Sequence, residues 1–293
     1  MEIMKLLAIE KKGVQPTLIT RAWHRVQERV RSPATRGRLA KMITWLRPRG
    51  APANTDIGIA ELKKHGVCMM PGFMNDAEIA KLRTALSEFN CFDPWREHLG
   101  EFRHDQIPQG THVAQIPCAA QIEQLHAIAY DRRLIDLVTA YFGCRPYLDS
   151  IQAWWSVSGN DEPEEAENFH RDNDSIRFLK FFLYATEVGE ENGPHVFVAG
   201  SHVQNTLTEH RRLSDSEVKA AFGVERIRIM TGKAGDAFME DTFGIHKGQL
   251  PKSGKRLLIQ FRYSVTESIF RSPLIVAPAA DIQPELATSL IND

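Results

Sequence analysis

The sequence predicts an α+β protein with a mainly β core, a jelly-roll flanked by helices that precede it in the chain. The first observation is a change of period: apolar residues recur at helical spacing up to Gly143, and from Arg145 onward they form short, strand-like runs. The second is that turn residues separate these runs at regular intervals, which is typical of β-sandwiches and barrels. The third is length, because 293 residues with 43% hydrophobic content can bury one large core.

The helices are predicted from periodicity and from the residues that begin and end them. Asn75 followed by Glu78 forms a capping-box start, and Gly66 is placed to end a short helix. Ser32-Pro33 separates two basic helices near the N-terminus. The expected helices span residues 17–30, 36–47, 59–65, 77–89, 121–131 and 132–143.

Strands are expected where β-branched and aromatic residues form runs bounded by turn residues. The insertion 203–225 contains a second capping box, Ser214 with Glu217, and we interpret it as a helix that lies on the surface or acts as a lid. The expected strands span residues 67–73, 147–157, 175–188, 195–202, 226–231, 235–241 and 256–265.

Charge is unevenly distributed along the chain. Residues 1–50 hold twelve Lys/Arg against three Asp/Glu, whereas the remainder holds 24 against 34. We therefore divide the chain into a basic helical arm with its linker, residues 1–56, and a core domain, residues 57–293. The arm suits peripheral contact with an anionic membrane or an acidic carrier protein, and equally a helix packed on its own domain with a solvated charged face. The core domain lacks a basic surface interleaved with aromatic residues, so no nucleic-acid partner is expected.

Cysteine usage indicates a reducing compartment. Cys68, Cys91, Cys118 and Cys144 are widely spaced and form no CxxC pair. Buried free thiols are therefore expected in place of a disulfide framework or a zinc ribbon. The N-terminus has no signal-peptide pattern, and no apolar run approaches the ~18 residues of a membrane span. These features predict a cytoplasmic protein.

The segment FHRDND contains the only H-x-D pattern in the chain, formed by His170 and Asp172. Alternate residues of a strand point to the same face, so both side chains can aim at one point. An imidazole and a carboxylate are two of the three ligands in the facial triad of non-haem Fe(II) oxygenases. The pair therefore predicts part of a metal site, whose third ligand has to come from a distant strand.

Four later histidines are candidates for this third ligand. His246 is favoured, because the strand-and-turn pattern GDAFMED leads into it and Gly248 follows it. His195 and His202 flank one predicted strand and are expected to be ordinary sheet-end histidines. His210 lies in the charged helical insertion and is expected in solvent.

A co-substrate with two carboxylates needs a guanidinium at the back of its pocket, since arginine binds a carboxylate through two parallel hydrogen bonds. Arg256 opens the strand RLLIQFRY ten residues beyond His246 and is the favoured anchor. Lys180 is the rival, although a strand lysine with its ammonium in water is the simpler interpretation. Arg262 is expected at the surface. Gln152, on the strand before the H-x-D pattern, is a further candidate to hydrogen-bond the co-substrate.

Several motifs resemble, in order along the chain, the phytanoyl-CoA dioxygenase family of Fe(II)/2-oxoglutarate-dependent oxygenases. They are HRD, SIRFLKFFLYATEVGEENGPHVFVAGSH, GDAFMEDTFGIHKG and KRLLIQFRY. The earlier segment LKKHGVCMMPGFMNDAEIAKLRTAL resembles the opening of the family, so the resemblance covers residues 57–268. Each motif alone is loose, but their combination in this order is specific. The resemblance implies a double-stranded β-helix, a cupin-like jelly-roll that holds a non-haem iron.

The same resemblance implies the residues of the site. It assigns His170, Asp172 and His246 as iron ligands and Arg256 as the partner of the distal carboxylate of 2-oxoglutarate. Fe(II), 2-oxoglutarate and O₂ would then oxidise an unactivated C–H bond of a small-molecule, lipid-like or carrier-linked substrate, releasing succinate and CO₂. Halogenating relatives have a small residue in place of the carboxylate ligand, so Asp172 favours hydroxylation.

Two other functions are compatible with these residues. A catalytically silent jelly-roll could serve as a binding protein, although no structural need explains the ligand set together with Arg256. A zinc-dependent hydrolase also uses two histidines and a carboxylate, but it would leave that arginine without a role. Binding of Fe(II) together with 2-oxoglutarate distinguishes the oxygenase from both.

Overall fold

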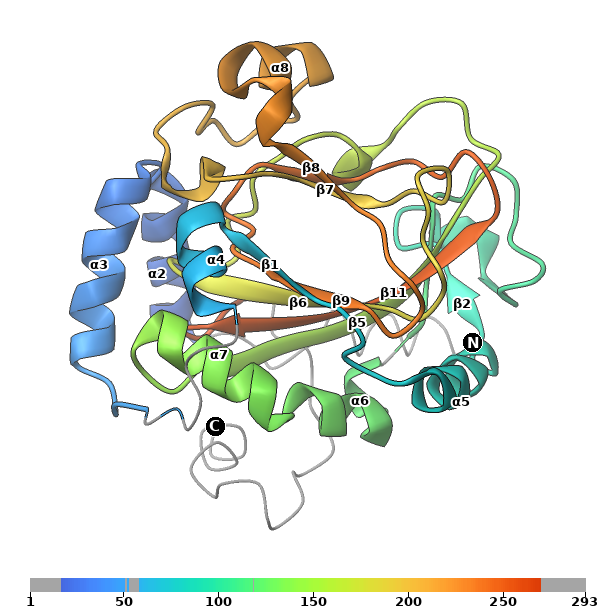
Figure 1. Cartoon of the computed structure of the whole chain (residues 1–293), viewed down its shortest axis with the longest axis horizontal. Coiled ribbons are helices and arrows are strands. Elements are labelled where there is room, and N and C mark those ends of the chain that lie inside the picture. Colours follow the sequence, from blue (N-terminus) through green and yellow to red (C-terminus); the bar gives the residue numbers. More distant parts are fainter. Residues whose placement is uncertain (1–16, 51, 53–57, 118, 270–293) are drawn as a thin grey trace.

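Apolar strands from along the whole chain form two β-sheets that face each other in a jelly-roll (Figure 1). The computed structural model describes residues 17–50, 52, 58–117 and 119–269. The strands are β1 (Val67–Met70), β2 (Cys91–Phe92), β3 (Glu101–Phe102), β4 (Val113–Gln115), β5 (Tyr147–Val157), β6 (Phe178–Tyr184), β7 (His195–Val198), β8 (Ile227–Met230), β9 (Ala237–Glu240), β10 (His246–Gly248) and β11 (Lys255–Ser264).

The sheets have the strand orders β1-β9-β6-β11-β5-β4-β2-β3 and β10-β7-β8. β11 pairs with β5 on one side and β6 on the other, so it runs through the middle of the larger sheet. The strand predicted over 147–157 is found with these bounds as β5. The run predicted over 175–188 forms a shorter strand, because the chain bends at 174–177 and again at 185–186.

The inner face of the larger sheet carries its side chains in rungs, because directly paired residues of antiparallel strands point to the same side. In order along β11, the rungs are Glu240–Lys180–Arg262–Ser150, Phe238–Phe182–Gln260–Gln152, Tyr184–Leu258–Trp154 and Arg256–Ser156. The first rung is charged and the last one holds an arginine, while the two rungs between them are uncharged and mostly aromatic or aliphatic, apart from Gln260 and Gln152. This separation leaves two polar regions at opposite ends of one interior.

Helices cover the outer face of the larger sheet and one edge of the molecule (Figure 1). α4 ends at Gly66, whose φ of +82° suits glycine and where a Cβ atom would come within 2.6 Å of His202 Nδ1. The capping box of Asn75 and Glu78 is confirmed at the start of α5. The α-helices are α2 (Leu18–Arg29), α3 (Pro33–Trp45), α4 (Ile59–His65), α5 (Asp76–Ser87), α6 (Glu123–Ala129), α7 (Arg132–Phe142) and α8 (Asp215–Phe222).

Two apolar layers hold these parts together. The larger one packs α5, α6 and α7 against the outer face of the large sheet through side chains such as Leu82, Leu125, Leu137 and Phe261. The smaller one lies between the sheets, where Phe197 and its neighbours pack on the inner rungs. Burial of this apolar surface is the main driving force for folding, and it fixes the distance between the two sheets.

The described helices of the basic arm pack on the jelly-roll. Arg36 of α3 is buried, donates to Asn173 Oδ1 at 2.7 Å and to the Ser175 carbonyl, and lies over the Phe243 ring at 4.2 Å. Gln27 of α2 donates to the Asp174 carbonyl at 3.2 Å. Residues 1–16 of the arm, and 51 and 53–57 of its linker, lie outside the described residues. The two helices therefore brace the segment 173–175.

Cys68, Cys91 and Cys144 are buried free thiols, as predicted, and Cys118 lies outside the described residues. Within the described ranges, none of the helices combines the length and the apolar character needed to cross a bilayer.

Arg36→Ala is expected to lower the free energy of unfolding by about 3 kcal/mol, because it leaves buried carbonyls without a donor and removes the contact with Phe243. Urea denaturation followed by circular dichroism measures the change. The matched control is Arg38→Ala, an exposed arginine of the same helix, which should change stability by less than about 0.5 kcal/mol. Equal effects of the two substitutions would contradict the bracing role.

Candidate metal centre

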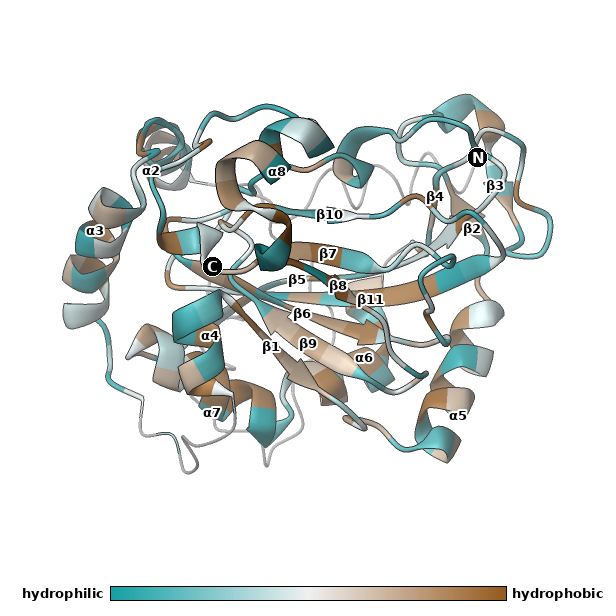
Figure 2. Cartoon of the chain, turned by 45° about the horizontal axis from the view of Figure 1, so that its top comes forward, coloured by the Kyte–Doolittle hydropathy of each residue, from teal (hydrophilic) through white to brown (hydrophobic). Residues whose placement is uncertain are grey.

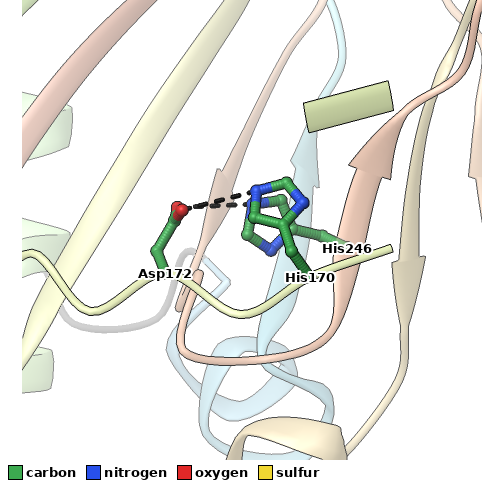
Figure 3. Close-up of side chains that lie close together, drawn as sticks. All are labelled: His170, Asp172 and His246. Atoms are coloured by element: carbon green, nitrogen blue, oxygen red, sulfur yellow. Dashed lines mark ion pairs between the residues drawn. The ribbon is translucent and has the colours of Figure 1, made fainter. Parts of the chain in front are cut away.

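Three side chains converge at one end of the space between the sheets. His170, Asp172 and His246 each offer one ligand atom, and these atoms lie within 4.8 Å of one another (Figure 3). Nε2 of His170 is 3.4 Å from Asp172 Oδ1, and Nε2 of His246 is 3.3 Å from Asp172 Oδ2. The three residues that the sequence singled out as metal ligands are therefore brought together.

The convergence does not rest on a regular strand through residues 170–172, as was predicted, but on a single bridge and a neighbouring hydrogen bond. His170 forms an isolated bridge with His246, in which each backbone N–H donates to the carbonyl of the other residue. Asp172 donates its N–H to the Thr242 carbonyl at 3.0 Å and lies outside any strand. The expectation of a regular strand at 170–172 is wrong, because a tight turn at 241–244 interrupts the partner segment.

Both imidazoles are oriented by their other ring nitrogen. Nδ1 of His170 lies 2.9 Å from the Asn168 carbonyl, and Nδ1 of His246 lies 2.9 Å from the Gly244 carbonyl. Because a carbonyl only accepts, each Nδ1 carries the proton and each Nε2 presents a lone pair to the centre. Burial lowers the pKa of His170, with a smaller contribution from His246, which favours the neutral ring that binds metal. Two neutral imidazoles and a carboxylate suit Fe(II), and also Zn(II).

A buried ion network supports the carboxylate ligand. Burial would raise the pKa of Asp172, but Lys180 Nζ at 2.6 Å, together with His246, holds that pKa well below its ordinary value of 3.8. Lys180 also lies 2.9 Å from Asp174 Oδ2, and Arg262 Nη1 lies 3.1 Å from the same oxygen. Asp172 is therefore ready to bind a cation without first losing a proton.

This network corrects two expectations from the sequence. Lys180 does not hold its ammonium in water, since the residue is 8% exposed and its charge faces Asp172 and Asp174. Arg262, expected at the surface, is 5% exposed because it pairs with Asp174 and, at 3.6 Å, with Asp149. Both residues stand in the first inner rung, where the sheet register places charges side by side.

Arg256 occupies the opposite end of the same interior. The residue is 3% exposed, and it donates to Ser156 Oγ at 3.1 Å and to the Gly193 carbonyl. Among the described residues, no acidic side chain forms an ion pair with it, and burial lowers its pKa. A buried guanidinium without an anion is costly, so this end of the interior suits a negatively charged ligand.

A cavity of about 220 Å³ joins the metal ligands to Arg256. Gln152 lines it and accepts a hydrogen bond from Gln260 at 2.9 Å. Trp95, which is 58% exposed, lies at its margin and marks an opening to solvent. The lining residues are Trp95, Val113, Gln115, Gln152, Trp154, Ser156, Ala166, Glu167, His170, Asp172, Lys180, Phe182, His195, His246, Gly248, Arg256, Leu258 and Gln260.

His195 opens β7, as expected for a sheet-end histidine, and it also lines the cavity. Its ring is stacked on His246 with 5.5 Å between centroids, and burial, followed by the charge of Arg256, holds its pKa well below the ordinary 6.5. Its Nε2 lies 2.9 Å from Oε2 of Glu240, although the angle does not suit a hydrogen bond. Burial raises the pKa of Glu240 to about 8, so this carboxyl holds its proton at neutral pH.

The remaining predicted histidines lie elsewhere. His202 lies at the end of the loop after β7, with Nε2 3.3 Å from the Lys63 carbonyl, and His210 is exposed as expected. Glu240 was not singled out from the sequence, and Lys180 was given a different role, but the sequence does carry a signal for both. Lys180 in FLKFFLY and Glu240 in AFME are single charges inside apolar strands, and such a charge is rarely buried without a partner.

Glu240→Gln is expected to stabilise the metal-free protein more at pH 8 than at about pH 5. An unfolded glutamate ionises near pH 4.5, whereas Glu240 in the fold keeps its proton up to about pH 8. Between these values folding takes up a proton, so the free energy of unfolding falls as pH rises, by up to about 1.4 kcal/mol per unit.

Differential scanning calorimetry of both proteins across this pH range measures the effect. Glu190→Gln, on the surface, is the control and should give no pH-dependent difference in Tm. The same Tm difference between wild type and Glu240→Gln at every pH would show that this carboxyl is not protonated in the fold.

Solved structures similar to this chain include several metal-dependent enzymes. EctD from S. alaskensis with bound Fe has a TM-score of 0.55 and 17% identity, and the match covers 80% of this chain and 92% of that chain. HygX from Streptomyces hygroscopicus with nickel and 2-oxoglutarate bound has a TM-score of 0.54 and 16% identity, with coverages of 79% and 94%. The non-heme alpha ketoglutarate dependent carbocyclase SnoK has a TM-score of 0.54 and 16% identity, with coverages of 74% and 86%. At these identities the likeness shows a shared fold.

A search of curated protein sequences gives no match to this chain. The family model of phytanoyl-CoA dioxygenase (PhyH), however, matches residues 62–256. The matched region contains the three converging ligands and ends at Arg256, and it is more than half of the 293 residues. The chain therefore belongs to the phytanoyl-CoA dioxygenase family.

Proposed function

We propose that this protein is a non-haem Fe(II)/2-oxoglutarate-dependent dioxygenase that hydroxylates a C–H bond of a small-molecule substrate. The observation that carries the proposal is the pairing of two features in one cavity: a centre of two histidines and an aspartate, and a buried arginine without an acidic partner among the described residues. A metal that is chelated by one end of a dicarboxylate fits the first feature, and its distal carboxylate fits the second.

Each part of the cavity has a role in this proposal. His170, Asp172 and His246 would hold Fe(II). Bound iron, with its co-substrate and O₂, supplies the oxidising chemistry that yields succinate and CO₂. Arg256 and Ser156 bind the distal carboxylate, and Gln152 with Gln260 lines the path between the two ends.

Lys180 is assigned a positioning role in place of co-substrate binding. Its ammonium is already paired with Asp172 and Asp174, at 2.6 and 2.9 Å. It therefore holds the carboxylate ligand ionised and in place, whereas Arg256 remains available for an anion. Of the two anchors considered from the sequence, Arg256 and Lys180, only Arg256 is therefore proposed to bind the co-substrate.

The size of the cavity bears on the substrate. Its volume of about 220 Å³ suits 2-oxoglutarate with the reacting part of a substrate, so the remainder of a lipid-like or carrier-linked molecule would extend past Trp95. The buried thiols favour a reducing compartment, and we propose the cytoplasm.

The alternatives explain fewer of these features. A zinc hydrolase accounts for the three ligands but leaves the buried charge of Arg256 unneutralised. A silent binding protein accounts for the cavity, but it gives no reason to hold Asp172 ionised beside two oriented imidazoles.

Anaerobic titration of the protein with Fe(II) and 2-oxoglutarate is expected to give a weak visible charge-transfer band, since both must bind one metal to produce it. Asp172→Ala should abolish this band and the formation of succinate in the presence of O₂. His210→Ala, which removes an exposed histidine, should leave both unchanged. Hydrolytic activity with Zn(II), without succinate formation under any condition, would favour the hydrolase instead.

Arg256→Met is expected to raise the KM for 2-oxoglutarate roughly 100-fold, which corresponds to ~2.7 kcal/mol, because a buried carboxylate loses its charged partner. The retained visible band at saturating 2-oxoglutarate would show that the metal site is intact. Arg228→Met, an arginine of β8 that is half exposed, is the control. An unchanged KM would mean that another residue binds the distal carboxylate.

A further inference from the structure

The basic arm turns apolar side chains outward. In α2 the buried residues are the polar His24 and Gln27, while Leu18 and Ile19 are 84% and 82% exposed and Val26 is 47% exposed. A helix that only packs on its domain buries its apolar side and exposes its polar side. Trp23 of α2 does pack against the main core, but Leu18, Ile19 and Val26 face solvent, so packing on the domain does not account for the apolar character of the outer face.

The next helix repeats this arrangement. α3 buries Arg36 and Ala40, while Met42, Trp45 and the following Leu46 are 66%, 77% and 76% exposed. Leu18, Ile19, Trp45 and Leu46 are the most exposed large apolar side chains of the described part of the chain. Exposed apolar area of this kind on consecutive helices indicates an interaction surface.

Basic side chains accompany these apolar ones. Residues 18–46 contain seven Lys/Arg and one Asp/Glu, and Arg25, Arg29, Arg38 and Lys41 are exposed. α2 and α3 lie together along one edge of the molecule (Figures 1 and 2). We call the outward-facing side chains of residues 18–46 the arm surface. It combines insertable apolar groups with positive charge.

We propose that the arm surface docks the protein on an anionic lipid bilayer. Basic residues contact the headgroups, while Leu18, Ile19, Trp45 and Leu46 enter the boundary between headgroups and acyl chains. Tryptophan favours this boundary, and long basic side chains reach from it to the phosphates. A bilayer fits better than an acidic protein because the four apolar side chains are 76% to 84% exposed. Such side chains can insert into a bilayer without a complementary pocket, which a protein partner would have to provide.

Docking through the outer side of α2 and α3 would bring the bilayer near the segment that follows Asp172, whatever reaction the site performs. The inner side of the same helices contacts the segment that follows Asp172, through Arg36 to Asn173 and Ser175 and through Gln27 to Asp174. A bilayer on the outer side therefore lies one helix layer away from this segment.

The test uses the full chain and sedimentation with vesicles of phosphatidylcholine, with or without roughly one-third phosphatidylglycerol. We expect binding to the anionic vesicles, which weakens as salt is raised from about 0.1 M to about 1 M because the Debye length shortens from ~10 to ~3 Å. The variant Leu18→Ser/Ile19→Ser/Trp45→Ser/Leu46→Ser should bind at least about tenfold more weakly. Arg25→Glu/Arg38→Glu/Lys41→Glu should lose binding to anionic vesicles selectively.

A matched control removes apolar side chains from another part of the surface. Val224→Ser/Ile229→Ser replaces residues that are 67% and 52% exposed, and it should bind vesicles like the wild type. Circular dichroism and Tm of each variant show whether it is folded, so a loss of binding by a folded variant supports the proposal. Wild-type protein that ignores anionic vesicles, or binds them equally well after the fourfold serine substitution, overturns it. A dimer in light scattering that the serine variant abolishes would identify a second copy as the occupant and overturn it too.

Discussion

The ionised carboxylate of Asp172 is the constraint on which the rest of the interior depends. A carboxylate removed from water normally takes up a proton, and a protonated one would be a poor metal ligand. Here Lys180 supplies the opposite charge at 2.6 Å, and Asp174 pairs with both Lys180 and Arg262. Lys180 and Arg262 lie in one rung of the large sheet, so the strand register fixes the two cations of the network, while Asp172 and Asp174 come from the segment that precedes β6.

The two ends of the interior differ in how their buried charges are neutralised. At one end acidic and basic side chains neutralise one another and leave a metal site. At the other end Arg256 is buried without an acidic partner in the described chain, and two uncharged rungs separate it from the first network. A cation together with a dicarboxylate satisfies both ends at once. This complementarity is stronger support for the proposed function than either end alone, because each end by itself occurs in structural ion networks.

Sequence reasoning predicted the parts of the fold that local patterns determine. The helix over 59–65, the strand over 147–157 and both capping boxes follow from periodicity and from the residues that begin and end elements. The convergence of His170, Asp172 and His246 was also predicted, because the H-x-D pattern and the later histidine can be recognised in the sequence. Partners from different strands were not predicted, since nothing in the sequence shows which rung Lys180 and Glu240 share. Register decides that, and register is a tertiary property.

The basic arm is best understood as a two-sided part of the domain. Its inner side completes the segment after Asp172, because Arg36 satisfies carbonyls that would otherwise be buried without donors. Its outer side is free of that task, which is why it can present Leu18 and Trp45 to another surface. Deleting the arm would remove both the contacts with residues 173–175 and the docking surface, so effects on metal binding could not be separated from effects on membrane binding. Substitutions confined to the outer side separate them, since those side chains have no part in the contacts with Asn173 and Ser175.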